Sequence, residues 1–132
     1  MHREGEKNMK ITNRKILEDM NTLKAVSQKQ FPVKVSYAIA KNISKIDSEL
    51  KIYEKERQKL IEQYSERDEG NKIISDESGN VKFADVDGWN KDIKELLDIE
   101  NEIEIHKFKF EELGNLNISA EELRVIDYMI EE

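Results

Sequence analysis

The chain has 132 residues, of which 37% are hydrophobic and 39% are charged, with one proline and five glycines. This composition is typical of a helix-rich protein with one modest core and much solvated surface. The absence of cysteine excludes disulfides, thiolate zinc sites and a thiol nucleophile. No apolar run is long enough to span a bilayer or to form a signal peptide, so we expect a cytoplasmic protein with no membrane partner.

The formal net charge of −7 is distributed unevenly along the chain. Residues 1–45 carry ten Lys/Arg and four Asp/Glu, whereas residues 46–132 carry twelve and twenty-five. Because the acidic part would repel a phosphate backbone, duplex nucleic acid is not an expected partner. The basic part either faces acidic surface within one fold or oligomer, or contacts a phosphate or an acidic partner.

Residues 1–8 are polar and are predicted to be a flexible tail, followed by a single helical domain over residues 9–132. A first helix is predicted to begin at Thr12 or Asn13, which are both favourable N-cap types, and to end before Phe31. Its apolar stripe consists of Ile16, Leu17, Met20 and Leu23.

A long second helix is predicted from about Pro32 to about Ser65, roughly 50 Å at about 1.5 Å per residue. Its first residues alternate like a strand, which we interpret as a helix start buried on more than one side, with Ala38 and Ala40 permitting close approach. Apolar residues then recur every three or four positions, which indicates a coiled-coil seam that pairs with a helix of this chain or of another copy. The predicted homo-oligomer seam consists of Ile39, Ile43, Ile46, Leu50 and Tyr53.

Turn residues and short apolar pairs predict a β-hairpin at about residues 72–84, with strands Ile73–Ser75 and Val81–Phe83. An isolated hairpin is marginal in water, so it needs a surface or a third strand. A third helix is expected to return antiparallel along the second. Its apolar stripe consists of Trp89, Ile93, Leu96, Leu97, Ile99 and Ile103.

The segment "IEIHKFKF" predicts an extended stretch with a bulge or bend at His106 and Lys107. Near the end of the chain, Ser119 and Glu122 form a capping-box pattern that starts a short helix from Ala120 to about Ile130. The predicted fold class is therefore mainly α with a small β component. It consists of a long helical hairpin or coiled-coil-like helices with a β-hairpin insert and a short C-terminal helix.

The sequence contains few patterns that indicate catalysis. "DVDGW" fails as a calcium loop, because its first ligand position would be Phe83 and its bidentate position Lys94. His2 and His106, the two histidines, have no neighbouring His or Cys at metal-ligand spacing. Phosphate-binding glycine motifs and the nucleophile elbow are absent from the sequence. We therefore expect no enzymatic activity, no metal and no cofactor.

Six residues are candidates for binding a partner or a small anionic ligand. Lys34, Tyr37 and Lys41 lie within two helical turns, and Lys107 and Lys109 follow on the extended segment. Arg57 occupies a seam position, where a polar residue sets register and partner number. The alternatives are that the lysines and Arg57 are simply solvated and that Tyr37 belongs to the core.

The stretch "FPVKVSYAIAKNISKIDSEL", a Glu/Lys-rich helix, a turn-rich insert and the closing "LNISAEELRVIDYMIEE" make most of the chain after about Met9 resemble a known group of proteins. These are small proteins of unknown function that are encoded by phages and prophages of Gram-positive bacteria. The resemblance implies a phage accessory protein that acts in the cytoplasm of the bacterial host. It implies no functional residues.

Three functions follow from these observations. The first is a non-enzymatic binding protein that occludes a host protein, for example one of antiphage defence. The second is an assembly or scaffolding factor with a phage protein as its partner. The third is an oligomeric sponge that sequesters a small anionic nucleotide signal, for which the basic and aromatic candidates would have to converge.

Overall fold

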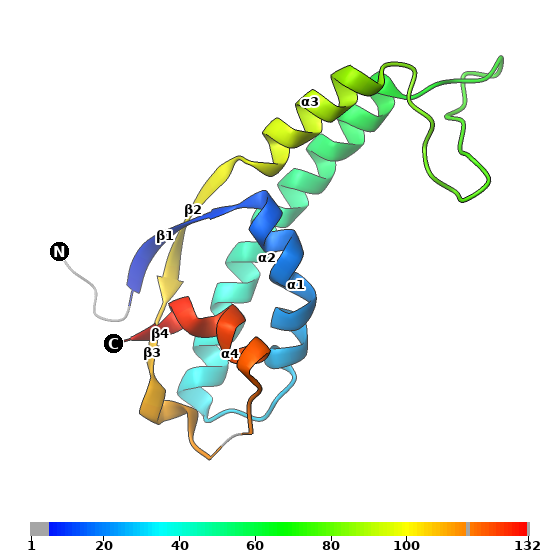
Figure 1. The fold of residues 1–132 in the computed structure, drawn as a ribbon. Coiled ribbons are helices and arrows are strands. Elements are labelled where there is room, and N and C mark those ends of the chain that lie inside the picture. Colours follow the sequence, from blue (N-terminus) through cyan, green and yellow to red (C-terminus); the bar gives the residue numbers. More distant parts are fainter. Residues whose placement is uncertain (1–5, 116, 132) are drawn as a thin grey trace. The chain divides into compact units, whose positions relative to one another are not determined.

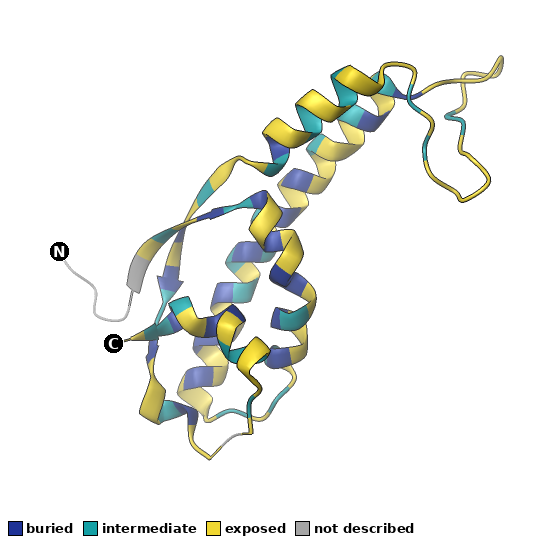
Figure 2. Cartoon of the chain, in the orientation of Figure 1, coloured by how far each residue is buried: buried dark blue, intermediate teal, exposed yellow. Residues whose placement is uncertain are grey.

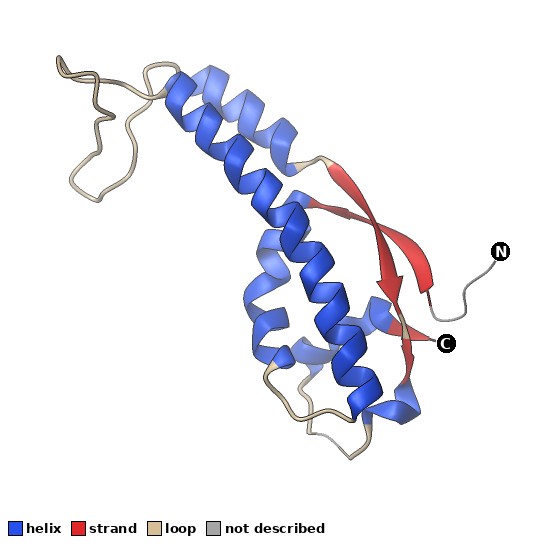
Figure 3. Ribbon diagram, turned by 180° about the vertical axis from the view of Figure 1, so that it is seen from behind, coloured by secondary structure: helices blue, strands red, loops and turns tan. Residues whose placement is uncertain are grey.

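The structure is a computed structural model that describes residues 6–115 and 117–131, with side chains from residue 8 onward (Figure 1). The fold is mainly α with a small β component, as predicted (Figure 3). The elements, in chain order, are β1 (Glu6–Thr12), α1 (Asn13–Ser27), α2 (Val33–Tyr64), α3 (Val86–Leu97), β2 (Glu100–His106), β3 (Phe108–Lys109), the 3-10 helix η1 (Phe110–Leu113), α4 (Ala120–Ile126), the 3-10 helix η2 (Asp127–Met129) and β4 (Ile130–Glu131). None of the helices in this described part of the chain is long and apolar enough to cross a membrane.

The chain forms two compact units, one of Met1–Leu50 with Glu100–Glu132 and one of Lys51–Ile99. Helix α2 contributes its first half to the first unit and its second half to the other. No linker or shift in composition indicated this division in the sequence, because α2 crosses the boundary without a break.

Strand β1 was not predicted from the sequence. Residues 6–8, which were expected to belong to the tail, are part of it, and residues 1–5 lie outside the described part of the chain. β1 pairs antiparallel with β2 in a regular register from Glu6 opposite His106 to Thr12 opposite Glu100. Because its partner lies far along the chain, only the tertiary structure could reveal this strand.

Helix α1 confirms the predicted start. The Thr12 side-chain oxygen accepts a hydrogen bond from the Lys15 N–H at 3.1 Å, which caps the helix. Of the predicted stripe, Ile16, Met20 and Leu23 are buried, whereas Leu17 is 40% exposed. Together with α2 and the inward face of β2, this stripe forms the core of the first unit, whose buried positions appear in Figure 2.

Helix α4 is anchored to α1 by a charged cluster. The buried Asp19 carboxylate lies 3.1 Å from the Arg124 guanidinium and 3.3 Å from the Lys15 ammonium. Arg124 also pairs with Glu121, and these hydrogen bonds hold the pKa of the Glu121 carboxyl below its usual range. A buried carboxylate needs such partners, because an unpaired charge is costly in a protein interior.

Helix α2 confirms the prediction to within one or two residues at each end, but its first turns are not buried on several sides. Val35, Ala38 and Ile39 face the core, whereas Val33 is 84% exposed. Ala40 is also exposed, so the expected close approach at that position does not occur. The alternation in the sequence combines two faces of one helix, because Val35 and Ile39 are buried whereas Val33 and Tyr37 are exposed.

In the second unit, α3 lies beside the second half of α2 (Figures 1 and 3), and the Tyr64 hydroxyl donates a hydrogen bond to Asp92. This hydrogen bond raises the pKa of Tyr64 above its ordinary value. α3 is shorter than predicted, because Ile99 lies beyond its end and Ile103 belongs to β2, opposite Met9. Strand pairing there overrides a helical pattern that continued in the sequence.

The predicted β-hairpin region forms isolated antiparallel bridges rather than two continuous strands. Three segments close a ring of main-chain hydrogen bonds, in which Glu66 N–H donates to Lys82, Lys82 N–H to Ile74 and Ile74 N–H to Glu66. The third segment that a marginal hairpin requires is therefore supplied by the residues directly after α2. Phe83 stacks on Trp89 with ring centroids 4.3 Å apart, which ties the region to α3.

Candidate functional site

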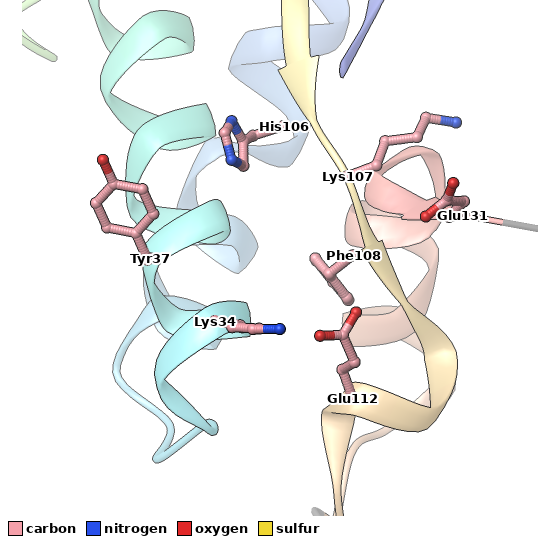
Figure 4. Close-up of a pocket in the computed structure, with 7 residues that line it drawn as sticks. All are labelled: Lys34, Tyr37, His106, Lys107, Phe108, Glu112 and Glu131. Atoms are coloured by element: carbon pink, nitrogen blue, oxygen red, sulfur yellow. The ribbon is translucent and has the colours of Figure 1, made fainter. Parts of the chain in front are cut away.

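A groove in the first unit separates the start of α2 from the segment that follows β2 (Figure 4). We call it the α2–β3 groove, and its volume is about 370 Å³. Its lining residues are Lys34, Tyr37, His106, Lys107, Phe108, Glu112 and Glu131.

The distance between α2 and the end of β2 is set by Asn42, which is fully buried. Its side-chain amide donates to the His106 carbonyl at 2.8 Å, and its side-chain oxygen accepts from the His106 N–H at 2.7 Å. One turn further along, the Lys45 ammonium donates to the Glu104 carbonyl at 2.8 Å. Since β2 is held to α2 in this way, Lys107 and Phe108 emerge at a defined position beside Lys34.

The opposite wall of the groove is built by short-range structure. β3 pairs parallel with β4, with Phe108 opposite Ile130, and this pairing brings Glu131 to the groove. The Glu112 carboxylate accepts a hydrogen bond from the Lys109 N–H at 2.9 Å at the start of η1. Glu112 is therefore held by a capping interaction and faces Lys34 across the groove (Figure 4).

Tyr37 provides the aromatic surface of the site. The residue is 56% exposed, and its ring lies edge-on to His106, with centroids 6.0 Å apart and an angle of 84° between the rings. The Lys41 ammonium lies 5.4 Å from the centre of the same ring, a distance typical of a cation–π contact. Tyr37 is thus an exposed aromatic residue with the Lys41 ammonium over its ring, not a core residue.

The charges of the groove are balanced. The groove is lined by two lysines, Lys34 and Lys107, and by two carboxylates, Glu112 and Glu131, so these four side chains sum to zero formal charge. Such a groove can hold a mixed-charge polypeptide segment more readily than a strongly anionic small molecule. Within residues 6–115 and 117–131, no three His, Asp or Glu side chains come together as metal ligands.

The structure brings together several candidates that are distant in the sequence. Lys34, Tyr37 and Lys107 line one groove, and Lys41 lies against Tyr37. Lys109 is exposed on β3 but does not line the groove, and Arg57 is exposed in the other unit.

The predicted oligomer seam is largely buried by the chain itself. Ile39, Ile46, Leu50 and Tyr53 are buried, and Ile43 is half-buried. Burial of these residues therefore requires no second copy.

Sequence reasoning missed Asn42, Glu112 and Glu131 as site residues, and the chemical roles that it considered for His106 were those of a metal ligand and a general base. Asn42 carried a signal, because it is a single amide at a position where Ile39 and Ile46 define the buried stripe. For Glu112 and Glu131 the sequence has no such signal, because their place depends on the pairing of β3 with β4.

Comparisons with known proteins identify a family but no characterised relative. No curated protein matches the chain, and no solved structure matches it. A family match covers residues 7–130, which is nearly the whole chain and includes every residue of the groove except Glu131. The chain therefore belongs to the family described as "Protein of unknown function (DUF1617)".

Proposed function

We propose that this protein is a non-enzymatic binding protein that occludes a partner protein, through a surface segment of mixed charge, with the exposed start of α2 and the adjoining α2–β3 groove. The observation that carries the proposal is the convergence of Lys34 and Tyr37 on α2 with Lys107 on the segment after β2. Lys107 is far from the other two in the sequence, yet all three residues line one groove, which Lys34 crosses toward Glu112 while the Lys107 side chain points away from α2 (Figure 4).

The chemistry of this surface suits a protein partner. An exposed tyrosine offers a large contact area at low entropic cost, and the flanking lysines offer charge complementarity and faster association. Val33 lies one turn before Tyr37 and adds exposed apolar area to the same face of α2. Glu112 and Glu131 add acceptors that can pair with donors of a polypeptide.

The partner we favour is a host protein, in particular one of bacterial antiphage defence, which this protein inhibits in the host cytoplasm. The resemblance to phage and prophage proteins supports this choice. A phage assembly or scaffolding role would use the same surface and differ only in the partner. A nucleotide sponge is less favoured, because Glu112 and Glu131 offset the two lysines of the groove.

The test starts with affinity capture of the tagged protein from host cells, with and without phage infection, and mass spectrometry of the bound proteins. The partner that is identified is then titrated against the double variant Lys34→Glu/Lys41→Glu. We expect at least about tenfold weaker binding, which corresponds to about 1.4 kcal/mol. The matched control is Lys55→Glu/Lys91→Glu, which changes two exposed lysines of the other unit by the same charge.

Equal binding by both double variants would overturn the assignment of the surface. Capture of virion proteins alone would favour the assembly role. A nucleotide released when the purified protein is heat-denatured would instead support the sponge.

A further inference from the structure

The two-stranded sheet of β1 and β2 has two edges, and among the described residues another element covers only part of the β2 edge. At the β2 edge, Asn42 and Lys45 hydrogen-bond to the main chain of His106 and Glu104. At the β1 edge, no hydrogen bond from the described residues reaches the main chain of Asn8 or Lys10 from outside the sheet. An open edge of this kind is a template for pairing with another strand.

The register shows which main-chain groups point to the open edge. In an antiparallel pair, residues alternate between those that bond to the neighbouring strand and those whose N–H and C=O point away from it. His106 and Glu104 point away from β1, because their main-chain groups bond to α2. Asn8 lies opposite Glu104, and Lys10 lies two residues further along β1, so both direct their N–H and C=O to the open edge.

We propose that a second copy of this chain pairs at this edge, β1 against β1 and antiparallel, to form a four-stranded sheet in the order β2-β1-β1-β2. This dimer interface is independent of the coiled-coil seam and of the function proposed above. A two-stranded sheet is marginal in water, so the added pairing also stabilises β1 itself.

A second copy fits the open edge better than a foreign strand does. Pairing of β1 with β1 is two-fold symmetric, so one contact satisfies the open edges of both copies. Both outer edges of the four-stranded sheet are then β2 edges, which Asn42 and Lys45 of α2 already cover at His106 and Glu104. A single foreign strand would instead leave a new open edge exposed.

The alternation of main-chain directions along β1 also limits the register in which the two copies of β1 can pair. Full overlap of Glu6–Thr12 with itself places Met9 opposite Met9 of the second copy and Asn8 opposite Lys10. Both members of that second pair direct their main-chain groups outward, so they form a hydrogen-bonded pair. A shift that places Lys10 opposite Lys10 is disfavoured, because like charges directly opposite each other repel.

Light scattering over a micromolar concentration series tests the proposal with wild type, Lys10→Pro and the control Lys10→Ala. Proline removes the outward N–H but no bond to β2, because Lys10 does not bond to that strand. We expect wild type and Lys10→Ala to be dimers and Lys10→Pro to raise the dimer dissociation constant at least about tenfold. A monomeric wild type, or a Lys10→Pro variant that is folded by circular dichroism and dimerises normally, would overturn the proposal.

Amide hydrogen exchange in the wild-type protein tests the same interface without any substitution. The proposal requires slow exchange at Asn8 and Lys10, to a degree comparable with Met9 and Ile11, which bond to β2 within the chain. Fast exchange at Asn8 and Lys10 with slow exchange at Met9 and Ile11 would show an open edge. That result would refute the interface even if the protein is dimeric through another surface.

Discussion

Replacement of Asn42 by leucine should destabilise the protein although it places an apolar residue in an apolar stripe. Asn42 is fully buried and forms two hydrogen bonds with the main chain of His106, one as donor and one as acceptor. Leucine has the same branched shape, with larger end groups, but cannot form either bond, so the His106 N–H and C=O lose the Asn42 side chain as a partner.

The magnitude follows from the cost of an unsatisfied main-chain group, which is about 1–3 kcal/mol for each buried donor or acceptor. His106 is half-buried, so the lower part of this range applies to each of its two groups. We therefore expect the free energy of unfolding to fall by about 2–3 kcal/mol. For a chain of this length, that loss lowers the melting temperature by roughly 10 °C.

The assay is urea unfolding followed by circular dichroism, with the transition midpoint compared at an unchanged slope. The matched control is Asn21→Leu, at an exposed position of α1, where leucine should be neutral or slightly stabilising because of its higher helix propensity. If Asn42→Leu were as stable as wild type, the reasoning that Asn42 positions the end of β2 would be wrong. The variant should also weaken partner binding, because the groove depends on that position.

Four further variants test other parts of the structure. Tyr128→Phe should raise stability by up to about 1 kcal/mol in thermal unfolding, because the buried Tyr128 hydroxyl has no hydrogen-bond partner among the described residues, and a decrease would contradict this. Glu122→Gln should flatten the acid limb of the stability profile, which is the fall in the free energy of unfolding as the pH is lowered. The hydrogen bond from the Ser119 N–H lowers the pKa of Glu122. The stabilisation by the Glu122 carboxylate is therefore present above the unfolded-state pKa and is lost as the pH falls through the folded-state pKa. An unchanged acid limb would show that this hydrogen bond does not contribute. Gly79→Ala should lower the free energy of unfolding by about 1 kcal/mol in chemical unfolding, because Gly79 has a φ of 84°, where a side chain is strained. A variant as stable as wild type would show that alanine is not strained at this position. Tyr37→Ala should leave the melting temperature nearly unchanged and weaken partner binding, whereas unfolding would show that Tyr37 is structural.

Local chemistry in the sequence determined the helix starts. Thr12 before α1 and the reciprocal Ser119–Glu122 bonds before α4 depend only on residues three positions apart, so the pattern alone predicts them. The extent of α2 was also predictable, because apolar residues recur at helical spacing over its whole length. The break at Lys107 between β2 and β3 was visible as a slip in the alternation of the same segment.

Contacts between distant segments decided the rest. Ile103 continues the apolar spacing of α3, yet it lies in β2 because Met9, near the other end of the chain, pairs with it. In the candidate site, the sequence placed Lys34 beside Tyr37 on one helix but could not place Lys107 or Glu112 next to them. Helix spacing is set within a few residues, whereas strand pairing and the Asn42–His106 hydrogen bonds join residues whose separation along the chain carries no local pattern.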